Sequence, residues 1–203
     1  MIFPLRSVRF GVGLAAVCLV AIGCSSRGGS VHFESTERNR TLTQAFPHAY
    51  ISQVQGGECD VILVDNATDW DYSTPKKNRP LEPTPLEPIR QMMHIHLYWR
   101  PLAGTTKNPA ATNASIDWYV LGPEGASDVV VYEGAGFVLL HGSGQEWTIV
   151  IRDGMVTPKV GRGSLQDPVG QAKISGRVVA KLNDARVRET MAEVLKQAGV
   201  ARK

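Results

Sequence analysis

The feature that most constrains the fold is a succession of strand-like runs between residues 92 and 182. Each run is rich in Val, Ile, Tyr, Trp or Phe and is bounded by Gly, Pro, Asn or Asp, a composition that favours the half-buried surface of a sheet. The connections are too short for the crossover that parallel neighbours need, so neighbouring strands should pair antiparallel. The predicted strands are 92–100, 115–121, 128–133, 136–141, 146–152 and 173–182, with turns at 122–125, 134–135, 142–144 and 153–154.

A hairpin is predicted ahead of these strands. The runs 49–55 and 58–65 are strand-like, and Gly56-Gly57 between them supplies the positive φ angles of a tight turn. The following segment, 66–90, carries five prolines, which remove backbone donors and disfavour both helix and central strand. We therefore expect an irregular Pro-rich loop at 66–90 after the hairpin.

One helix is predicted at the C-terminal end of the chain. Asn183 or Asp184 can cap its start, and Gly199 can close it. Its apolar residues fall at helical spacing, which predicts one stripe packed on a sheet: Val187, Met191, Val194, Leu195 and Ala198. Together the patterns predict a mainly β (α+β) fold, an antiparallel sheet, curled or sandwich-like, with one C-terminal amphipathic helix packed on it.

The N-terminal segment has the features of a targeting signal. Arg6 and Arg9 precede an apolar stretch at 10–22, which is short for a membrane span. The sequence Ala21-Ile22-Gly23-Cys24 follows, and with it the segment resembles the signal peptide of bacterial lipoproteins, whose lipobox it matches. The resemblance implies cleavage before Cys24 and acylation of that residue, including palmitate. An uncleaved transmembrane helix is the alternative.

The resemblance also implies a domain plan and a location. Residues 1–23 would be the signal peptide, 24–40 a lipid anchor with a polar, flexible tether, and 41–203 a single β-rich domain, ordered from about Leu42. The expected location is the bacterial cell envelope, where the lipid holds the protein to a membrane. Ser25, in place of Asp, implies in proteobacterial lipoproteins the periplasmic face of the outer membrane.

Charge and cysteine content narrow the possible partners. Two of the 22 Lys and Arg residues leave with the signal peptide, so the mature chain is nearly neutral against 19 Asp and Glu. With no basic run or aromatic-interleaved basic patch, nucleic acid is not an expected partner. Cys18 also leaves and Cys24 carries lipid, so Cys59 remains alone inside an apolar run. It is expected to be a buried thiol rather than a nucleophile.

The motif that most suggests chemistry is His94-Ile95-His96. On a strand, alternate side chains share a face, so both imidazoles should project from the same side and could bind one divalent ion. A catalytic zinc would need a third ligand, for which His141 is the first candidate. The alternatives are carboxylates: Asp117, Glu133 and Glu146.

Two functions remain open from the sequence. The first is a membrane-anchored, non-catalytic binding or structural module without a cofactor, whose partner is an envelope protein or a small ligand. It is favoured because the chain holds no nucleophile elbow and no phosphate-binding loop. The second is a metal-binding protein or metal-dependent hydrolase that uses zinc or another divalent transition metal at His94, His96 and His141.

Overall fold

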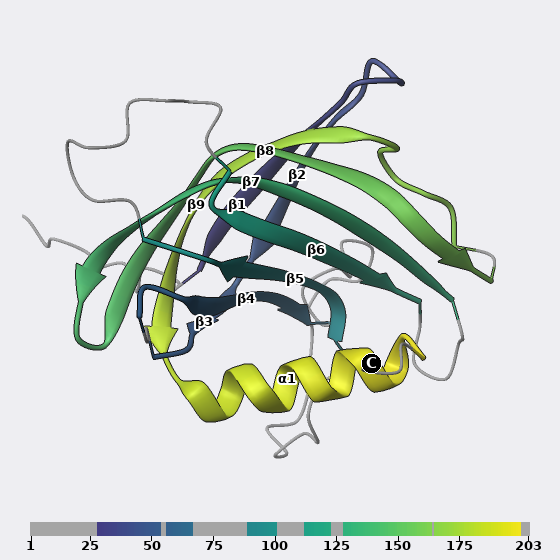
Figure 1. Cartoon of the computed structure of the whole chain (residues 1–203). Helices are drawn as coiled ribbons and strands as arrows, with labels where there is room; N and C mark the ends of the chain where they lie inside the picture. The colour runs from purple at the N-terminus through teal and green to yellow at the C-terminus, as the bar shows by residue number, and fades with distance from the viewer. Residues whose placement is uncertain are drawn as a thin grey trace, which may run out of the picture.

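The computed structural model describes residues 28–53, 56–66, 89–100, 112–122, 128–163 and 165–199. Nine strands and one helix lie in these ranges (Figure 1). The predicted signal peptide and Cys24 fall outside these ranges, as does most of the predicted Pro-rich loop. The strands are β1 (Gly29–Ser35), β2 (Thr41–Phe46), β3 (His48–Ile51), β4 (Cys59–Asn66), β5 (Ile89–Leu97), β6 (Ala114–Leu121), β7 (Val129–Ser143), β8 (Glu146–Arg162) and β9 (Ala172–Leu182), and the helix is α1 (Asp184–Gln197).

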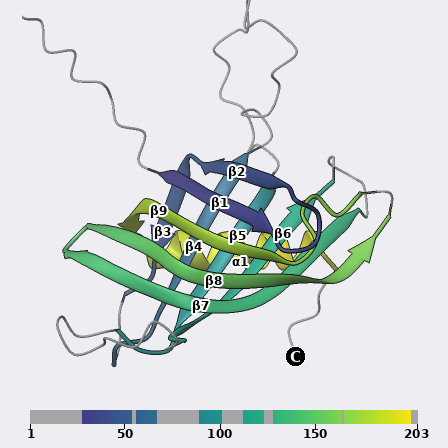
Figure 2. The same ribbon diagram turned by 90° about the horizontal axis from the view of Figure 1, so that it is seen from above.

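The sheet curls until it closes on itself. From β3 to β9, each strand pairs antiparallel with the next one in the chain. Closure comes from a short parallel pairing, in which Tyr50 and Ile51 of β3 lie opposite Lys181 and Leu182 of β9. β1 pairs with β9 on the same edge as β3, and β2 pairs with β1 (Figure 2). The predicted mainly β fold with a curled sheet is confirmed.

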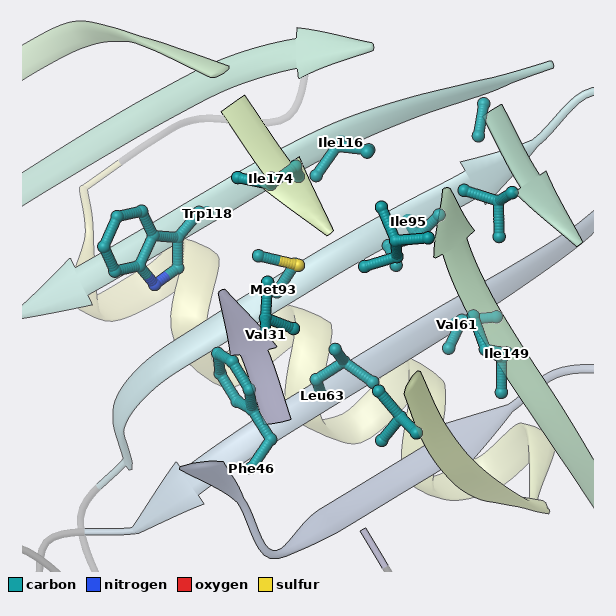
Figure 3. Close-up of a cluster of buried hydrophobic side chains, with 14 of the residues drawn as sticks. Val31, Phe46, Val61, Leu63, Met93, Ile95, Ile116, Trp118, Ile149 and Ile174 are labelled. Atoms are coloured by element: carbon teal, nitrogen blue, oxygen red, sulfur yellow. The ribbon is translucent and has the colours of Figure 1, made fainter. Parts of the chain in front are cut away.

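The interior of the curled sheet is filled by its own side chains. Alternate residues of each strand point inward, as on Met93, Ile95 and Leu97 of β5, all of which are fully buried. Figure 3 shows Met93 and Ile95 packed among side chains from the neighbouring strands and from β1 and β8. The aromatic rings of Phe33, Trp118 and Tyr132 stack in sequence, with centroids 4.2 and 4.6 Å apart. One contiguous apolar core therefore occupies the inside.

Helix α1 covers the outer face of one part of this sheet. Asn183 caps it, accepting a hydrogen bond from the backbone N–H of Arg186, and Gly199 follows it with a positive φ of 60°. Val187 and Val194 pack on a second apolar cluster that includes outward-facing residues of β4 to β7. The predicted helix and its apolar stripe are confirmed. In the part of the chain that the structure describes, no helix is both long and apolar enough to cross a membrane.

Several predicted strands and turns differ from the structure. The hairpin around Gly56-Gly57 is confirmed, with φ angles of 63° and 96° at the two glycines. The predicted turn at 134–135, however, lies within β7. A Cβ at Gly134 would overlap the backbone of Met155, so this glycine permits close strand packing instead of a reversal. The predicted turn at 153–154 is an irregularity in the β8–β9 register, which bends the long strand without ending it.

The predicted flexible tether also needs correction. Residues 24–40 were expected to be flexible, yet β1 occupies Gly29–Ser35 and pairs on both sides. Val31 and Phe33 are fully buried, whereas His32 and Glu34 between them are exposed. This alternation is that of a strand with one face in the core. The composition of this segment is polar mainly because its outward residues Ser30, His32 and Glu34 are polar, and the strand is therefore not evident from composition alone.

Candidate functional site

Four polar side chains gather on the outer face of β4, β5 and β6, beside the end of the surface that α1 covers. This His–Asp cluster consists of Asp60, His94, His96 and Asp117. The strand register places Asp60 opposite His96, and His94 opposite Asp117. Because Met93, Ile95 and Leu97 fill the interior, the pleat of β5 directs both histidines outward, as the sequence predicts.

Asp60 links the two histidines. Its Oδ1 atom lies 2.9 Å from Nε2 of His94 and 2.9 Å from Nδ1 of His96. On the other side of His94, Nδ1 lies 3.7 Å from Oδ2 of Asp117. The side chain of His94 is only 13% exposed, compared with 33% for His96. His94 is thus enclosed between two carboxylates, and His96 keeps one side toward solvent.

The two carboxylates control the charge of the cluster. Burial alone would lower the pKa of His94, but the carboxylates of Asp117 and Asp60 outweigh this effect and raise the pKa to about 9. Conversely, the hydrogen bond from His94 lowers the pKa of Asp60 to about 2, against the opposing effect of burial. At neutral pH, His94 is therefore an imidazolium paired with carboxylates.

The third histidine predicted for a metal site lies elsewhere. His141 is exposed near the β7–β8 hairpin, opposite Thr148. His96 lies opposite Ser115 of β6, which lies opposite Ala135 of β7. His141 is six residues further along β7 than Ala135, a distance of about 20 Å. Within the described residues, there is no group of three or more His, Cys, Asp or Glu side chains that could hold a metal ion.

The predicted carboxylate alternatives are also separated. Asp117 joins the cluster, and Glu133 lies opposite Asp117 on the next strand. Glu146 begins β8 opposite Lys181, on another part of the sheet. The residue that sequence reasoning missed is Asp60. Asp60 stands within an apolar run of the sequence, but strand alternation between inward-facing Cys59 and Val61 places it on the outer face.

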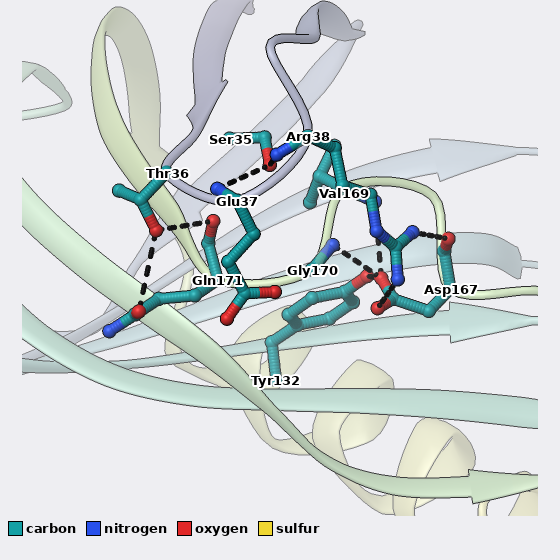
Figure 4. Close-up of polar contacts among 9 residues, drawn as sticks. All are labelled: Ser35, Thr36, Glu37, Arg38, Tyr132, Asp167, Val169, Gly170 and Gln171. Atoms are coloured by element: carbon teal, nitrogen blue, oxygen red, sulfur yellow. Dashed lines mark hydrogen bonds and ion pairs between the residues drawn. The ribbon is translucent and has the colours of Figure 1, made fainter.

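A second polar network lies at the end of the sheet where residues 165–171 approach the β1–β2 turn (Figure 4). Tyr132 reaches out of the core and donates its hydroxyl hydrogen bond to Oδ1 of Asp167. The same oxygen accepts from the backbone N–H groups of Val169 and Gly170. Arg38, from the β1–β2 turn, pairs with Oδ2 of Asp167 at 3.0 Å.

This second network has a structural role. Burial and the hydrogen bond to Asp167 both raise the pKa of Tyr132, so its hydroxyl stays protonated and donates. Val169, two residues after Asp167, is fully buried in the core. The network therefore fixes the 165–171 segment over one end of the closed sheet. Cys59, the cysteine within the described residues, is buried with its pKa raised to about 12, chiefly by burial, as expected for an inert side chain.

Fold and cluster together define a class: a closed, mainly antiparallel sheet with a filled interior, one C-terminal helix outside it and a His–Asp cluster beside that helix. No protein-family model matches the chain, and no curated protein or solved structure matches it either. Function must therefore be inferred from the residues and their geometry.

Proposed function

We propose that this protein is a lipid-anchored lipoprotein of the bacterial cell envelope whose folded domain is a non-catalytic binding or structural module. The observation that carries the proposal is the lipobox-like sequence ending at Cys24, followed after a few residues by the first strand of the sheet, at Gly29. Each buried methylene contributes about 0.8 kcal/mol, so two or more acyl chains on Cys24 hold a protein to a membrane stably.

The packing of the domain supports a role at its surface. Side chains from every strand fill the inside of the closed sheet, including Trp118, Tyr132 and Phe33. Both ring nitrogens of His94 and one ring nitrogen of His96 lie against carboxylates of the His–Asp cluster. Contact with an envelope component would then involve the outer surface and its loops, and the outer membrane is the location we propose for it.

The proposal is tested by metabolic labelling with palmitate in a bacterial host. The wild-type chain should incorporate label and fractionate with membranes, and Cys24→Ala should lose both properties. Cys59→Ala is the matched control, because it removes a thiol that is buried in the fold, and it should label like the wild type. Equal labelling of wild type and Cys24→Ala would overturn the proposal.

A metal-dependent role at His94 and His96 is the second candidate. The observation in its favour is that one carboxylate oxygen of Asp60 lies 2.9 Å from a nitrogen of each imidazole. Metal analysis of the purified protein after reconstitution with zinc separates the two functions. Near-stoichiometric metal that is lost in His94→Ala/His96→Ala, with the fold retained, would establish the metalloprotein. The binding module predicts no such difference.

A further inference from the structure

The outer face of the sheet on the side away from α1 differs in chemistry from the His–Asp cluster. We call it the anchor face, and its members alternate with the core residues of β7, β8 and β9. No described helix covers it: in Figure 1, α1 lies beneath β3 to β5 while β7 to β9 arch over the other side. It consists of half-buried Phe137, Leu139, Val150 and Val179, with the cations Arg152, Lys173, Arg177 and Lys181.

The apolar and cationic residues of this face are interleaved. Leu139 lies opposite Val150, and Val150 lies opposite Arg177. On its other side Arg177 faces Ser30 of β1, so neither cross-strand neighbour of this guanidinium is charged. Arginine and lysine with apolar residues between them are typical of surfaces that rest at a lipid headgroup layer.

The lipid attachment point lies close to the same face. The carbonyl of Gly28 accepts a hydrogen bond of 3.2 Å from the backbone N–H of Val179. Only four peptide steps separate Cys24 from Gly28, and even a fully extended chain spans no more than about 14 Å over four residues. An acylated Cys24 therefore holds the Val179 end of the face within about that distance of the bilayer.

The anchor face and the His–Asp cluster also differ in charge. Three carboxylates border the anchor face, of which Glu34 lies opposite Lys173 and Glu146 opposite Lys181, and Asp153 is the third. Across β4 to β7, the two cross-strand rows of the His–Asp cluster contain the carboxylates of Asp60, Asp117 and Glu133 beside the imidazolium of His94, and no lysine or arginine. An anionic membrane surface attracts cationic side chains and repels carboxylates, so it favours the anchor face.

We propose that the anchor face rests on the phospholipid bilayer that holds the Cys24 lipid, with Arg177 and Arg152 at lipid phosphates and Val150, Val179 and Leu139 at the headgroup boundary. Guanidinium groups pair with phosphate oxygens through two parallel hydrogen bonds. Helix α1 and the His–Asp cluster then face away from the bilayer. This inference rests on the proposed lipidation of Cys24.

The test uses the full chain, matured in a bacterial host and reconstituted through its own lipid into vesicles of phosphatidylethanolamine and phosphatidylglycerol. A fluorophore is attached to Arg177→Cys or, as the matched control beside the His–Asp cluster, to Glu133→Cys; both native side chains are exposed. Phospholipids with a nitroxide headgroup then quench fluorophores near the membrane. We expect quenching at position 177 to be several-fold stronger than at position 133.

Each outcome bears on one proposal. Equal quenching at the two positions, or stronger quenching at 133, overturns the orientation while leaving the lipoprotein intact. The thiol of Arg177→Cys could instead be protected from a thiol reagent in native membranes, yet react with it in lipid vesicles and carry an unquenched fluorophore there. That result indicates that a protein covers this face, and it also overturns the bilayer contact. If palmitate labelling shows no acylation of Cys24, the proposed function fails first, and the orientation fails with it.

Discussion

At the scale of single residues, the structure is governed by how buried polar groups are satisfied. His94 is almost enclosed, yet it remains charged because Asp60 and Asp117 flank it. A charged imidazole without such partners would be neutralised by burial. The cluster therefore stabilises the fold only while the imidazolium and both carboxylates are charged. Its contribution to stability can be measured from the pH dependence of unfolding.

Stability should fall in alkaline solution because of His94. Its pKa is about 9 in the folded protein, against an ordinary value of 6.5. The folded state therefore holds the proton more tightly, and this contribution is complete below pH 6.5 and lost as the pH rises to 9. We expect the free energy of unfolding in urea to decrease by about 1 to 3 kcal/mol over this interval. His94→Gln should abolish the decrease, and His141→Gln, which changes an exposed histidine, should preserve it.

The hydroxyl of Tyr132 should stabilise the segment at 165–171. Tyr132→Phe keeps the stacked ring and removes one donor to Asp167, a loss of about 1 kcal/mol in the free energy of unfolding. Hydrogen exchange at Val169 and Gly170 should accelerate, because their amides bond to the same carboxylate. Tyr98→Phe, at a side chain that is 51% exposed, serves as the control. Unchanged exchange at both amides would contradict the assigned role.

At the scale of elements, β1 changes where the folded domain begins. It pairs with β9 and β2, and Phe33 places its ring 4.2 Å from that of Trp118. A strand held on both sides cannot act as a tether. The folded domain therefore reaches to within about five residues of Cys24, the proposed lipid attachment site, and this short distance underlies the proposed orientation on the membrane.

Removing the core side chain of β1 should destabilise the whole domain. Phe33→Ala deletes a fully buried ring and should cost about 3 to 5 kcal/mol in the free energy of unfolding. Glu34→Ala, at the adjacent outward position, should change it by less than about 0.5 kcal/mol. Chemical denaturation of the two variants makes the comparison. If the two variants have similar free energies of unfolding, the side chain of Phe33 does not pack in the core, and the flexible tether predicted from the polar composition is correct.

At the scale of the whole molecule, closure makes the fold one cooperative unit. β9 pairs with β8, β1 and β3, and it leads directly into α1. The backbone N–H of Asn183, between β9 and α1, donates to the carbonyl of Ile51 in β3. Sheet closure and helix docking are thus linked through the same few residues.

We therefore expect a single unfolding transition. Far-ultraviolet circular dichroism, which follows the sheet and helix, should give the same denaturation midpoint as the fluorescence of the protein, to which core Trp118 contributes. A variant that weakens helix docking, Val194→Ala, should shift both midpoints together. An early transition seen by circular dichroism alone would mean that α1 separates before the sheet unfolds.

The sequence alone determined those features that depend on neighbours in the chain. Alternation of apolar residues in β5 and β6, helical spacing in α1 and the glycine pair at 56–57 each specify their local structure, because side-chain direction follows directly from backbone geometry. The outward placement of His94 and His96 follows from the same rule.

Only the tertiary structure decided what depends on pairing between distant segments. Asp60 meets His94 and His96 because β4 and β5 pair in one particular register across a long connection. Gly134 and Gly154 lie inside strands and not in turns. Glycine is suited to both positions because the backbone of Met155 and the side chain of Ile174, respectively, leave no room for a Cβ atom. Tertiary pairing also recruits the polar segment of β1 into the sheet. Which strands pair, and in which register, depends on the packing of the whole core. The local composition of one strand does not identify its partner strand.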